Sequence, residues 1–184
     1  KFIGNTAGEP GGALCIQSYQ GCEIDQCEFI RNKDCAIYVE TEFNSSGTSV
    51  TNRPSTRLNK ITITNCLFEK NEGTQTSCIT LAATHSQGQF SLNNCSFNDC
   101  ATSEVTGNAI TLTSSTSIPI SIENSFIEFN EITGFNGIKI QSSKSINLNH
   151  VEFKKTAQNS ALIIKSTSGT TTLTVDDCVF DSCS

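Results

Sequence analysis

Apolar and polar residues alternate with a period of two in many short segments of this chain, and these segments follow one template. The clearest copy is 61–71, in which Ile61, Ile63, Cys66 and Phe68 are apolar and Asn71 closes the segment. Further copies lie at 22–32, 90–100, 120–130, 146–156 and 173–183, with a half copy at 2–5. Because alternate side chains of a strand point to opposite faces, the pattern predicts strands with one buried face.

Aligning the copies gives columns of similar residues. The aromatic column holds Phe2, Phe29, Phe68, Phe97, Ile127, Phe153 and Phe180. The closing column holds Asn5, Asn32, Asn71, Cys100, Asn130, Thr156 and Cys183. We expect the first column to form an internal aromatic stack. We expect the asparagines of the second to form a ladder at a bend, because asparagine tolerates a left-handed backbone and its amide can bond to the next amide. A second asparagine run consists of Asn65, Asn94 and Asn124.

A second block follows each template and consists of a small residue and alternating apolar positions. Its copies are 13–16, 36–39, 78–81, 109–112, 137–140 and 161–164. Each repeat therefore predicts about three short strands, while the spacing of the aromatic column varies from 26 to 39 residues. Constant strands with loops of variable length favour a solenoid in which each strand pairs with its counterpart about 4.8 Å away.

We therefore predict an all-β fold, a right-handed parallel β-helix (solenoid) of about six coils of three short strands. The prediction treats 1–184 as a single β-helix segment, excised from a longer solenoid. Two other folds fit this pattern less well. A leucine-rich repeat needs units of nearly constant length, and a β-sandwich shows alternation without stacked columns.

Composition narrows the function classes. The chain has 184 residues, a net charge of −6 and 36% hydrophobic residues, without Trp or Met. This acidic balance argues against nucleic acid and against an anionic membrane surface, both of which attract basic patches. The longest apolar run is far shorter than the roughly 18 residues of a membrane span, so we expect no direct membrane insertion of this segment.

Ten cysteines are numerous for this length and raise the question of disulfides. Several lie in template columns that Ile, Val, Phe or Ser fill elsewhere, as Cys66 and Cys95 do, which is typical of small buried hydrophobic residues. We expect most thiols to be free; if one bridge forms, Cys35 with Cys78 is the pair we would choose. We expect no metal and no cofactor, because the chain has no Cys-x-x-Cys pair and neither His85 nor His150 has a ligand spacing.

Catalytic chemistry has little support in the sequence. Enzymes that cleave polysaccharides on β-helices need clustered carboxylates, and Asp176–Asp177 is the one adjacent acid pair in the printed sequence. The corresponding residues of the other copies are mostly Thr and Asn, so a solvated polar turn explains the pair. We assign no catalytic residue.

The repeat resembles the polymorphic membrane protein family of autotransporter adhesins, whose members belong with pectin-lyase-like β-helices. That family alternates Phe-x-x-Asn with Gly-Gly-Ala-Ile/Leu/Val; here 2–5 reads Phe-Ile-Gly-Asn and 11–14 reads Gly-Gly-Ala-Leu. Copies 29–32 and 68–71 match the first half alone, most Gly-Gly pairs are lost, and cysteine is abundant. A cysteine-rich surface protein of a eukaryotic microbe fits the same features. The resemblance implies a surface-exposed stalk that binds host cells or matrix, but it transfers no functional residues.

The longest interruption of the repeat is the inserted loop 41–60, which carries Asn44, Arg53, Arg57 and Lys60. A loop that leaves a rigid scaffold is free to bind, so these four residues are our candidate binding residues. Asn44 also begins a glycosylation sequon, Asn-Ser-Ser. A second sequon begins at Asn94, and we expect the fold to make it inaccessible.

Three functions remain open. We favour a non-catalytic β-helical solenoid at the cell surface or outside the cell, adhesin-like or a structural stalk. Its partners would be a host or neighbouring cell-surface protein or glycan, with lateral self-association also possible. The alternatives are a carbohydrate-active enzyme, either a polysaccharide lyase or a glycoside hydrolase, and a filament or scaffold component.

Overall fold

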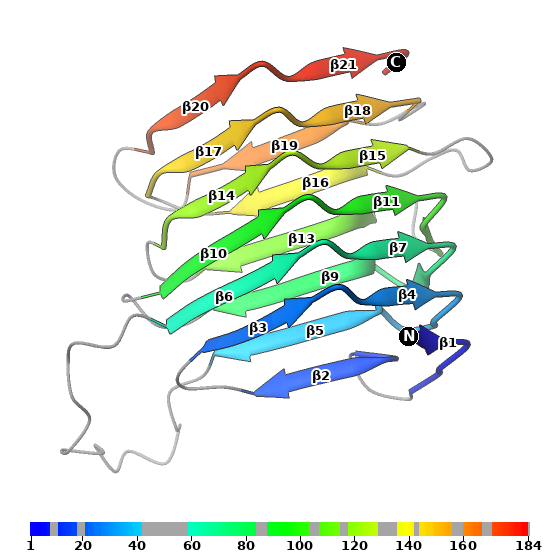
Figure 1. The fold of residues 1–184 in the computed structure, drawn as a ribbon. Coiled ribbons are helices and arrows are strands. Elements are labelled where there is room, and N and C mark those ends of the chain that lie inside the picture. The colour runs from blue at the N-terminus through cyan, green and yellow to red at the C-terminus, as the bar shows by residue number, and fades with distance from the viewer. Residues whose placement is uncertain are drawn as a thin grey trace, which may run out of the picture.

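Three sheets of parallel strands make up the computed structural model (Figure 1). It describes residues 1–7, 11–17, 21–41, 59–83, 88–103, 107–114, 118–128, 136–141, 144–155, 160–166 and 171–183. Every helix or strand assigned within these ranges is a strand, so the chain is all-β. Within the same ranges, no helix has the length and hydrophobicity needed to cross a membrane.

The first sheet contains the aromatic column. Its strands are, in spatial order, β1 (Phe2–Ile3), β4 (Glu28–Ile30), β7 (Leu67–Glu69), β11 (Ser96–Asn98), β15 (Phe126–Glu128), β18 (Glu152–Lys154) and β21 (Val179–Asp181). The second sheet contains the first half of each template. Its strands are β3 (Gly21–Asp25), β6 (Asn59–Thr64), β10 (Gly88–Asn93), β14 (Ile120–Glu123), β17 (Ile146–Asn149) and β20 (Leu173–Asp176).

The third sheet contains the second block of each repeat. Its strands are β2 (Leu14–Gln17), β5 (Ile37–Thr41), β9 (Thr76–Ala83), β13 (Asn108–Ser114), β16 (Asn136–Gln141) and β19 (Leu162–Lys165). Two short strands, β8 (Glu72–Gly73) and β12 (Ala101–Thr102), form a further parallel pair at the edge between the first and third sheets. Successive repeats thus lie on top of one another, an arrangement compatible with a parallel β-helix.

The register of the strands reproduces the sequence columns. Phe29 lies opposite Phe68, and Phe68 lies opposite Phe97. In the second sheet, Ile61 pairs with Phe90, which pairs in turn with Ile120. The prediction that equivalent residues stack from repeat to repeat is therefore confirmed for parallel strands.

The aromatic column forms the internal stack that the sequence predicts. The rings of Phe2, Phe29, Phe68 and Phe97 follow one another with centroids 4.6–5.0 Å apart and planes within 8° of parallel. Phe29, Phe68 and Phe97 are fully buried. Each such side chain contributes roughly 1.5–3 kcal/mol through burial of apolar surface. The stack therefore ties the first sheet to the core of the molecule.

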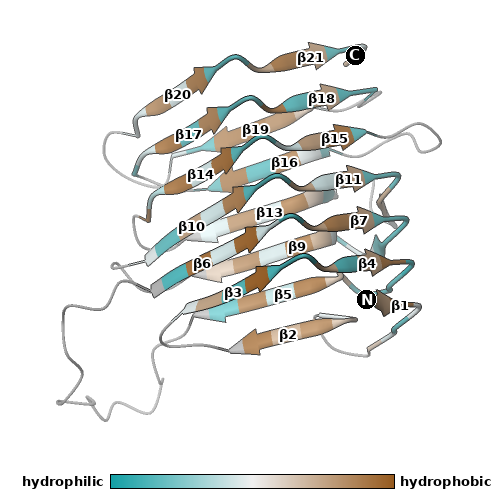
Figure 2. Ribbon diagram, in the orientation of Figure 1, coloured by the Kyte–Doolittle hydropathy of each residue, from teal (hydrophilic) through white to brown (hydrophobic). Residues whose placement is uncertain are grey.

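A single left-handed residue turns the chain from the second sheet into the first. The residues with positive φ at this corner are Gln26, Asn65, Asn94, Asn124, His150 and Asp177. Their backbone N–H groups continue the ladder; that of Asn65, for example, donates to the carbonyl of Asn93 at 3.1 Å. Figure 2 shows hydrophilic residues at these bends, while the strands contain both hydrophobic and hydrophilic residues. The corner thus turns without breaking the pairing between repeats.

The asparagine ladder of the closing column is also present, but its backbone differs from the prediction. The Nδ2 of Asn5 donates to Oδ1 of Asn32 at 2.9 Å, and Nδ2 of Asn32 donates to Oδ1 of Asn71 at 2.9 Å. Asn32 and Asn71 are fully buried. The left-handed residue is the one before each asparagine, such as Arg31 or Lys70. Asn130 lies outside the described residues.

The second asparagine run is less regular than the sequence suggests. Nδ2 of Asn94 donates to Oδ1 of Asn65 at 2.7 Å, but Nδ2 of Asn124 donates to Asn93 rather than Asn94. Asn94 is an exposed residue, so the expectation that its sequon is inaccessible was wrong. At the solvated corner these side-chain amides can bond to either of two neighbouring residues. Burial restricts the side-chain amides of the closing column.

The glycine before the first small residue has a steric cause. A Cβ atom on Gly12 would lie 1.6 Å from the carbonyl oxygen of Lys33 in the next repeat. The backbone N–H of Gly12 donates to the carbonyl of Cys35 at 2.6 Å. The Gly-Gly-Ala motif at 11–13 therefore reflects a close approach of two backbones.

The aromatic stack yields a stability prediction. Phe97→Ser replaces a fully buried ring by a small polar group and leaves a cavity between Phe68 and Ile127. We expect it to lower the free energy of unfolding by at least about 3–5 kcal/mol, the range for Phe→Ala in cores. Urea unfolding followed by circular dichroism measures the change. Ser91→Ala, at an outward position of β10, serves as the control and should unfold like the wild type. An unchanged midpoint for Phe97→Ser would contradict the inward assignment.

Candidate binding cleft

A cleft of about 490 Å³ opens at the outer side of the third sheet. Its lining residues include one outward column of this sheet: Tyr38 on β5, Thr80 on β9, Thr111 on β13 and Lys139 on β16. Strand pairing places these four residues directly opposite one another in turn. Three strand spacings separate the first from the last, about 14 Å along the stack. The strands that carry them lie one above another in Figure 1.

Asn108, at the start of β13, forms part of the cleft wall and is 4% exposed. Its Oδ1 atom is buried and has no hydrogen-bond partner within the described part of the chain. Asn136 occupies the paired position on β16 and is fully bonded. Its Nδ2 donates to the carbonyl of Gly107 at 3.1 Å, and its Oδ1 accepts from the N–H of Ser160 at 3.1 Å. One acceptor, buried in the wall and not exposed to the cleft, therefore has no partner among the described residues.

An irregularity of the ladder shapes this part of the wall. Asn108 pairs with Thr76, whereas Ile110 pairs with Ile79, so β9 contains one residue more than β13 between the two pairs. Such a bulge redirects the side chains beside it. Here the hydroxyls of Thr76 and Thr111 meet at 2.7 Å in the cleft lining.

Asp34 and Cys35 form the edge of the cleft ahead of β5. Both have positive φ, 64° and 72°, which is costly for residues with a Cβ atom. The Cys35 thiol hydrogen-bonds to the carbonyl of Ile37 at 3.1 Å and to the hydroxyl of Thr80 at 3.4 Å. Burial of this thiol raises its pKa to about 11, which makes it a poor nucleophile at neutral pH.

The Cys35–Cys78 disulfide is absent. The thiol of Cys35 reaches the backbone carbonyl of Cys78 at 3.5 Å, and both side chains are free. The left-handed backbone at Cys35 aims its sulfur at this carbonyl instead of at the second sulfur. All ten cysteines are free thiols.

The interior thiols replace apolar residues in the columns, as predicted. Cys66 and Cys95 are 3% and 2% exposed and follow one another in successive repeats. A hydrogen bond between their side chains lowers the pKa of Cys66 to about 7, because it favours the thiolate there. It raises the pKa of Cys95, which burial raises further. Both thiols face the core rather than the cleft.

The charges that line the cleft within the described ranges are Asp34 and Lys139. Hydrolysis of a glycosidic bond ordinarily uses two carboxylates on either side of the bond. The described lining supplies one carboxylate together with a phenol, hydroxyls, two amides and an ammonium group. This arrangement is suited to hydrogen bonding with a polar ligand.

The acid pair of the sequence does not act as a pair. Oδ2 of Asp177 lies 2.9 Å from Nε2 of His150 in the neighbouring repeat, at the left-handed corner. Asp176 ends β20, where it lies opposite Asn149. More than half of the side-chain surface of both His150 and Asp177 is exposed. The contact is thus an exposed pair between two repeats.

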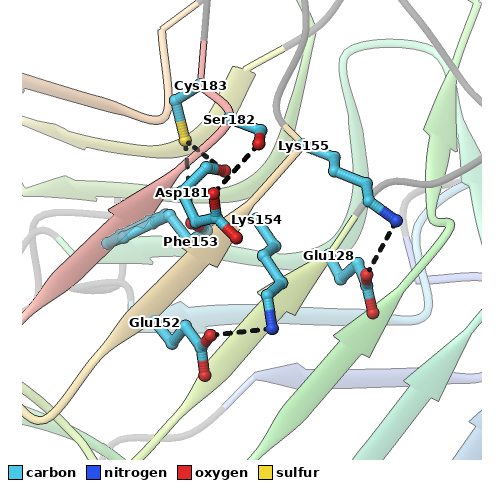
Figure 3. A network of polar contacts seen from close by, with 8 residues as sticks. All are labelled: Glu128, Glu152, Phe153, Lys154, Lys155, Asp181, Ser182 and Cys183. Atoms are coloured by element: carbon cyan, nitrogen blue, oxygen red, sulfur yellow. Dashed lines mark hydrogen bonds and ion pairs between the residues drawn. The ribbon is translucent and has the colours of Figure 1, made fainter.

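A network of polar contacts covers the last strands of the first sheet (Figure 3). Lys155 lies 3.5 Å from Glu128, Lys154 lies 3.0 Å from Glu152, and Ser182 donates to Asp181 at 2.9 Å. Exposed ion pairs of this kind are worth at most about 1 kcal/mol. The network belongs to the solvated surface of the fold.

The predicted binding residues of the loop 41–60 fall mostly outside the described residues. This applies to Asn44, Arg53 and Arg57. Thr41 ends β5, and Lys60 is an exposed residue near the start of β6, paired with Gly21 and Gln89. Lys60 is therefore not among the residues that line the cleft.

Sequence reasoning missed the cleft residues. Tyr38 and Lys139 stand at positions that vary between repeats, and Asn108 recurs as Asn136 but pairs with Thr76 on the other side, so the columns give no reason to select them. One signal was available: aligning 76–79 with 108–110 shows the extra residue in β9. Among the described residues, no group of three or more His, Cys, Asp or Glu side chains is arranged to hold a metal ion.

Comparison of the chain with family models, curated proteins and solved structures found no match. The site must therefore be interpreted from its own chemistry.

The free thiols give a direct test. Denatured but unreduced protein should react with a thiol reagent at all ten cysteines. In the native protein, the exposed Cys15 should react first and the buried Cys35 and Cys78 last, because burial raises their pKa values. Mass spectrometry after timed alkylation identifies the order. A lower count in denaturant would reveal a disulfide and contradict the assignment.

Proposed function

We propose that this chain is a right-handed parallel β-helix of about six coils that acts as a non-catalytic solenoid at the cell surface or outside the cell. In this role it presents its outer faces to a partner, as an adhesin or stalk does. Connections between parallel strands are right-handed in about 98% of cases, which supports the hand. The six template copies support the number of coils.

One observation carries this proposal. The repeated columns explain the interior residues as parts of the fold, and the polar groups that remain for recognition lie on the outer surface. Phe68 and Asn71 each bond or stack with their counterparts in adjacent repeats. The outer cleft is lined by the outward column Tyr38, Thr80, Thr111 and Lys139, whose chemistry differs from repeat to repeat. A rigid support with an outward binding surface suits attachment better than catalysis.

The resemblance to polymorphic membrane proteins and pectin-lyase-like β-helices supports the same role. The Gly-Gly-Ala segment at 11–13 has the close backbone approach that makes glycine necessary there. Burial raises the pKa values of Cys35, Cys78 and Cys95, which makes these three thiols poor nucleophiles in an oxidising exterior. Partners of this kind are host or neighbouring cell-surface proteins or glycans.

The loop 41–60 is the second contact surface that we propose, with Asn44, Arg53, Arg57 and Lys60 as its binding residues. It leaves β5 after Thr41, at the opposite end of that strand from Asp34 and Cys35. The loop and the cleft can therefore be altered separately.

Deleting residues 45–57 tests the proposed loop contact. We expect the variant to melt like the wild type, because both flanking strands keep their pairing partners, and to bind cells less strongly. Flow cytometry with labelled protein on a panel of microbial and animal cells measures the binding. Ser91→Ala is the surface control. Equal binding by the deletion variant would remove the loop from the contact surface.

The non-catalytic assignment predicts that polysaccharides stay intact. Incubating the purified chain with pectin, alginate, xylan and glucan should release neither reducing ends nor unsaturated uronic acids, because the described cleft lining offers one carboxylate. Colorimetric assay of reducing ends and absorbance of the unsaturated products measure this. Turnover of any of these substrates that Asp34→Asn abolishes would establish the carbohydrate-active alternative.

A further inference from the structure

We propose that Asn94 is a site of N-linked glycosylation, with a lipid-pyrophosphate-linked oligosaccharide as the donor. The modification rests on the proposed function, because it requires export of the chain through a eukaryotic secretory route. In the transfer, Nδ2 of Asn94 forms a bond to C1 of the first sugar and gives up one proton. The bond from C1 to the pyrophosphate oxygen breaks, and the lipid pyrophosphate leaves.

The sequon 94–96 lies at a corner of the fold that has room for a glycan. Asn94 is the left-handed residue, with a φ of 52°, between β10 and β11, and it is exposed. Figure 1 shows this corner as the bend between these two strands. An attached glycan is bulky and hydrated, so a surface position accepts it and a core position does not. The position of Asn94 therefore meets the steric requirement.

The side-chain amide of Asn94 has a hydrogen that a sugar can replace. A primary amide carries two N–H donors, and within the described part of the chain Nδ2 of Asn94 uses one, to Oδ1 of Asn65 at 2.7 Å. Attachment of a sugar replaces one hydrogen and leaves the other for this bond. The buried Asn71 differs, because its Nδ2 donates both to the carbonyl of Phe29 and to the sulfur of Cys100.

Pairing between repeats at this corner depends on the backbone and not on the Asn94 side chain. The backbone N–H of Asn94 donates to the carbonyl of Glu123 at 3.1 Å. Nδ2 of Asn124 bonds to Asn93 and not to Asn94, so the Asn94 amide does not continue the ladder into the next repeat. A glycan on Asn94 thus leaves the pairing of β10 with its neighbours in place.

The repeat provides internal controls for the sequon. Asn65 and Asn124 are exposed and left-handed like Asn94, and they occupy the same corner in the adjacent repeats. A sequon also needs Ser or Thr two residues after the asparagine. In corner order, that position holds Glu28, Leu67, Ser96, Phe126, Glu152 and Val179. The same backbone geometry therefore has the acceptor chemistry at one of these six corners.

Secretion of the full chain from a eukaryotic cell line, behind a signal peptide, tests the site. The Asn44→Gln background removes the other sequon. We expect this protein to run more slowly in electrophoresis, and peptide N-glycosidase should abolish the difference. Mass spectrometry should then detect deamidation at Asn94, which marks the former attachment point. Asn94→Gln and Ser96→Ala should each remove the glycan completely, whereas Ser96→Thr should keep it.

Matched variants separate the sequon from the fold. Ser91→Ala, on the same strand as Asn94, should keep the glycan. In the Ser96→Ala background, Leu67→Ser supplies the missing hydroxyl after Asn65 and should restore a glycan one repeat earlier. Because transfer precedes secretion, cell lysates report the glycan even for a variant that is not secreted. Enzymatic removal of the glycan should leave the melting temperature of the secreted protein nearly unchanged, since the backbone bond at the corner remains.

Each outcome decides one claim. A glycan at Asn94 in secreted, folded protein supports the site. A glycan at Asn44 alone, a shift that persists in Ser96→Ala, or a glycan at Asn94 confined to retained, misfolded chains overturns it. An unmodified chain that still binds cells overturns the site but leaves the proposed function. A chain glycosylated at Asn94 that attaches to no cell contradicts the proposed function and leaves the site.

Discussion

Pairing of each strand with its counterpart one repeat away is the constraint on which the whole structure depends. Parallel strands about 4.8 Å apart place equivalent side chains directly over one another. The residue at a position in one repeat therefore restricts which residue fits at that position in the next repeat. A phenylalanine must stack on a phenylalanine or an isoleucine, as Phe97 does between Phe68 and Ile127. In the closing column a buried asparagine bonds to the amide one repeat away, as Asn32 does to Asn71. The corners obey the same rule, since left-handed residues recur at each turn and their N–H groups extend the ladder.

The columns could be predicted from sequence because the chain repeats this constraint six times. Aligning the template was enough to identify the aromatic stack, the inner asparagine ladder and the cysteines that replace apolar residues. Structural details that depend on a single residue cannot be predicted by aligning the template copies. The left-handed position lies one residue before Asn32 and Asn71, and Asn124 bonds to Asn93 instead of Asn94. The left-handed backbone at Cys35 directs its sulfur toward a carbonyl, and the sequence around Cys35 does not predict this turn.

The cleft could not be predicted from the sequence, for the same physical reason. Outward side chains have no neighbour in the core to satisfy, so their identity changes from repeat to repeat: Tyr38, Thr80, Thr111 and Lys139 share a column but no chemistry. A search for recurring residues selects structure and passes over such positions. The loop 41–60 is a candidate binding segment because it interrupts the repeat. Interruptions of a repeat are thus a second feature by which functional residues can be found. The bulge in β9 is a further interruption, one residue long, that lies beside the cleft.

A repetitive scaffold makes its own exceptions informative. Asn108 and Asn136 are the same residue at paired positions, yet one has its amide fully bonded and the other keeps a buried oxygen unpaired. The backbone N–H in register with each asparagine explains the difference. That of Ser160 donates to Oδ1 of Asn136, whereas that of Asn136 donates to the carbonyl of Gly107 and leaves Oδ1 of Asn108 without a donor. Two consecutive left-handed residues at Asp34 and Cys35 break the pattern at the other edge of the same cleft. Strained backbone, an added residue and an unpaired acceptor thus occur together among the residues that line one cleft. Each costs stability in a fold built from repetition.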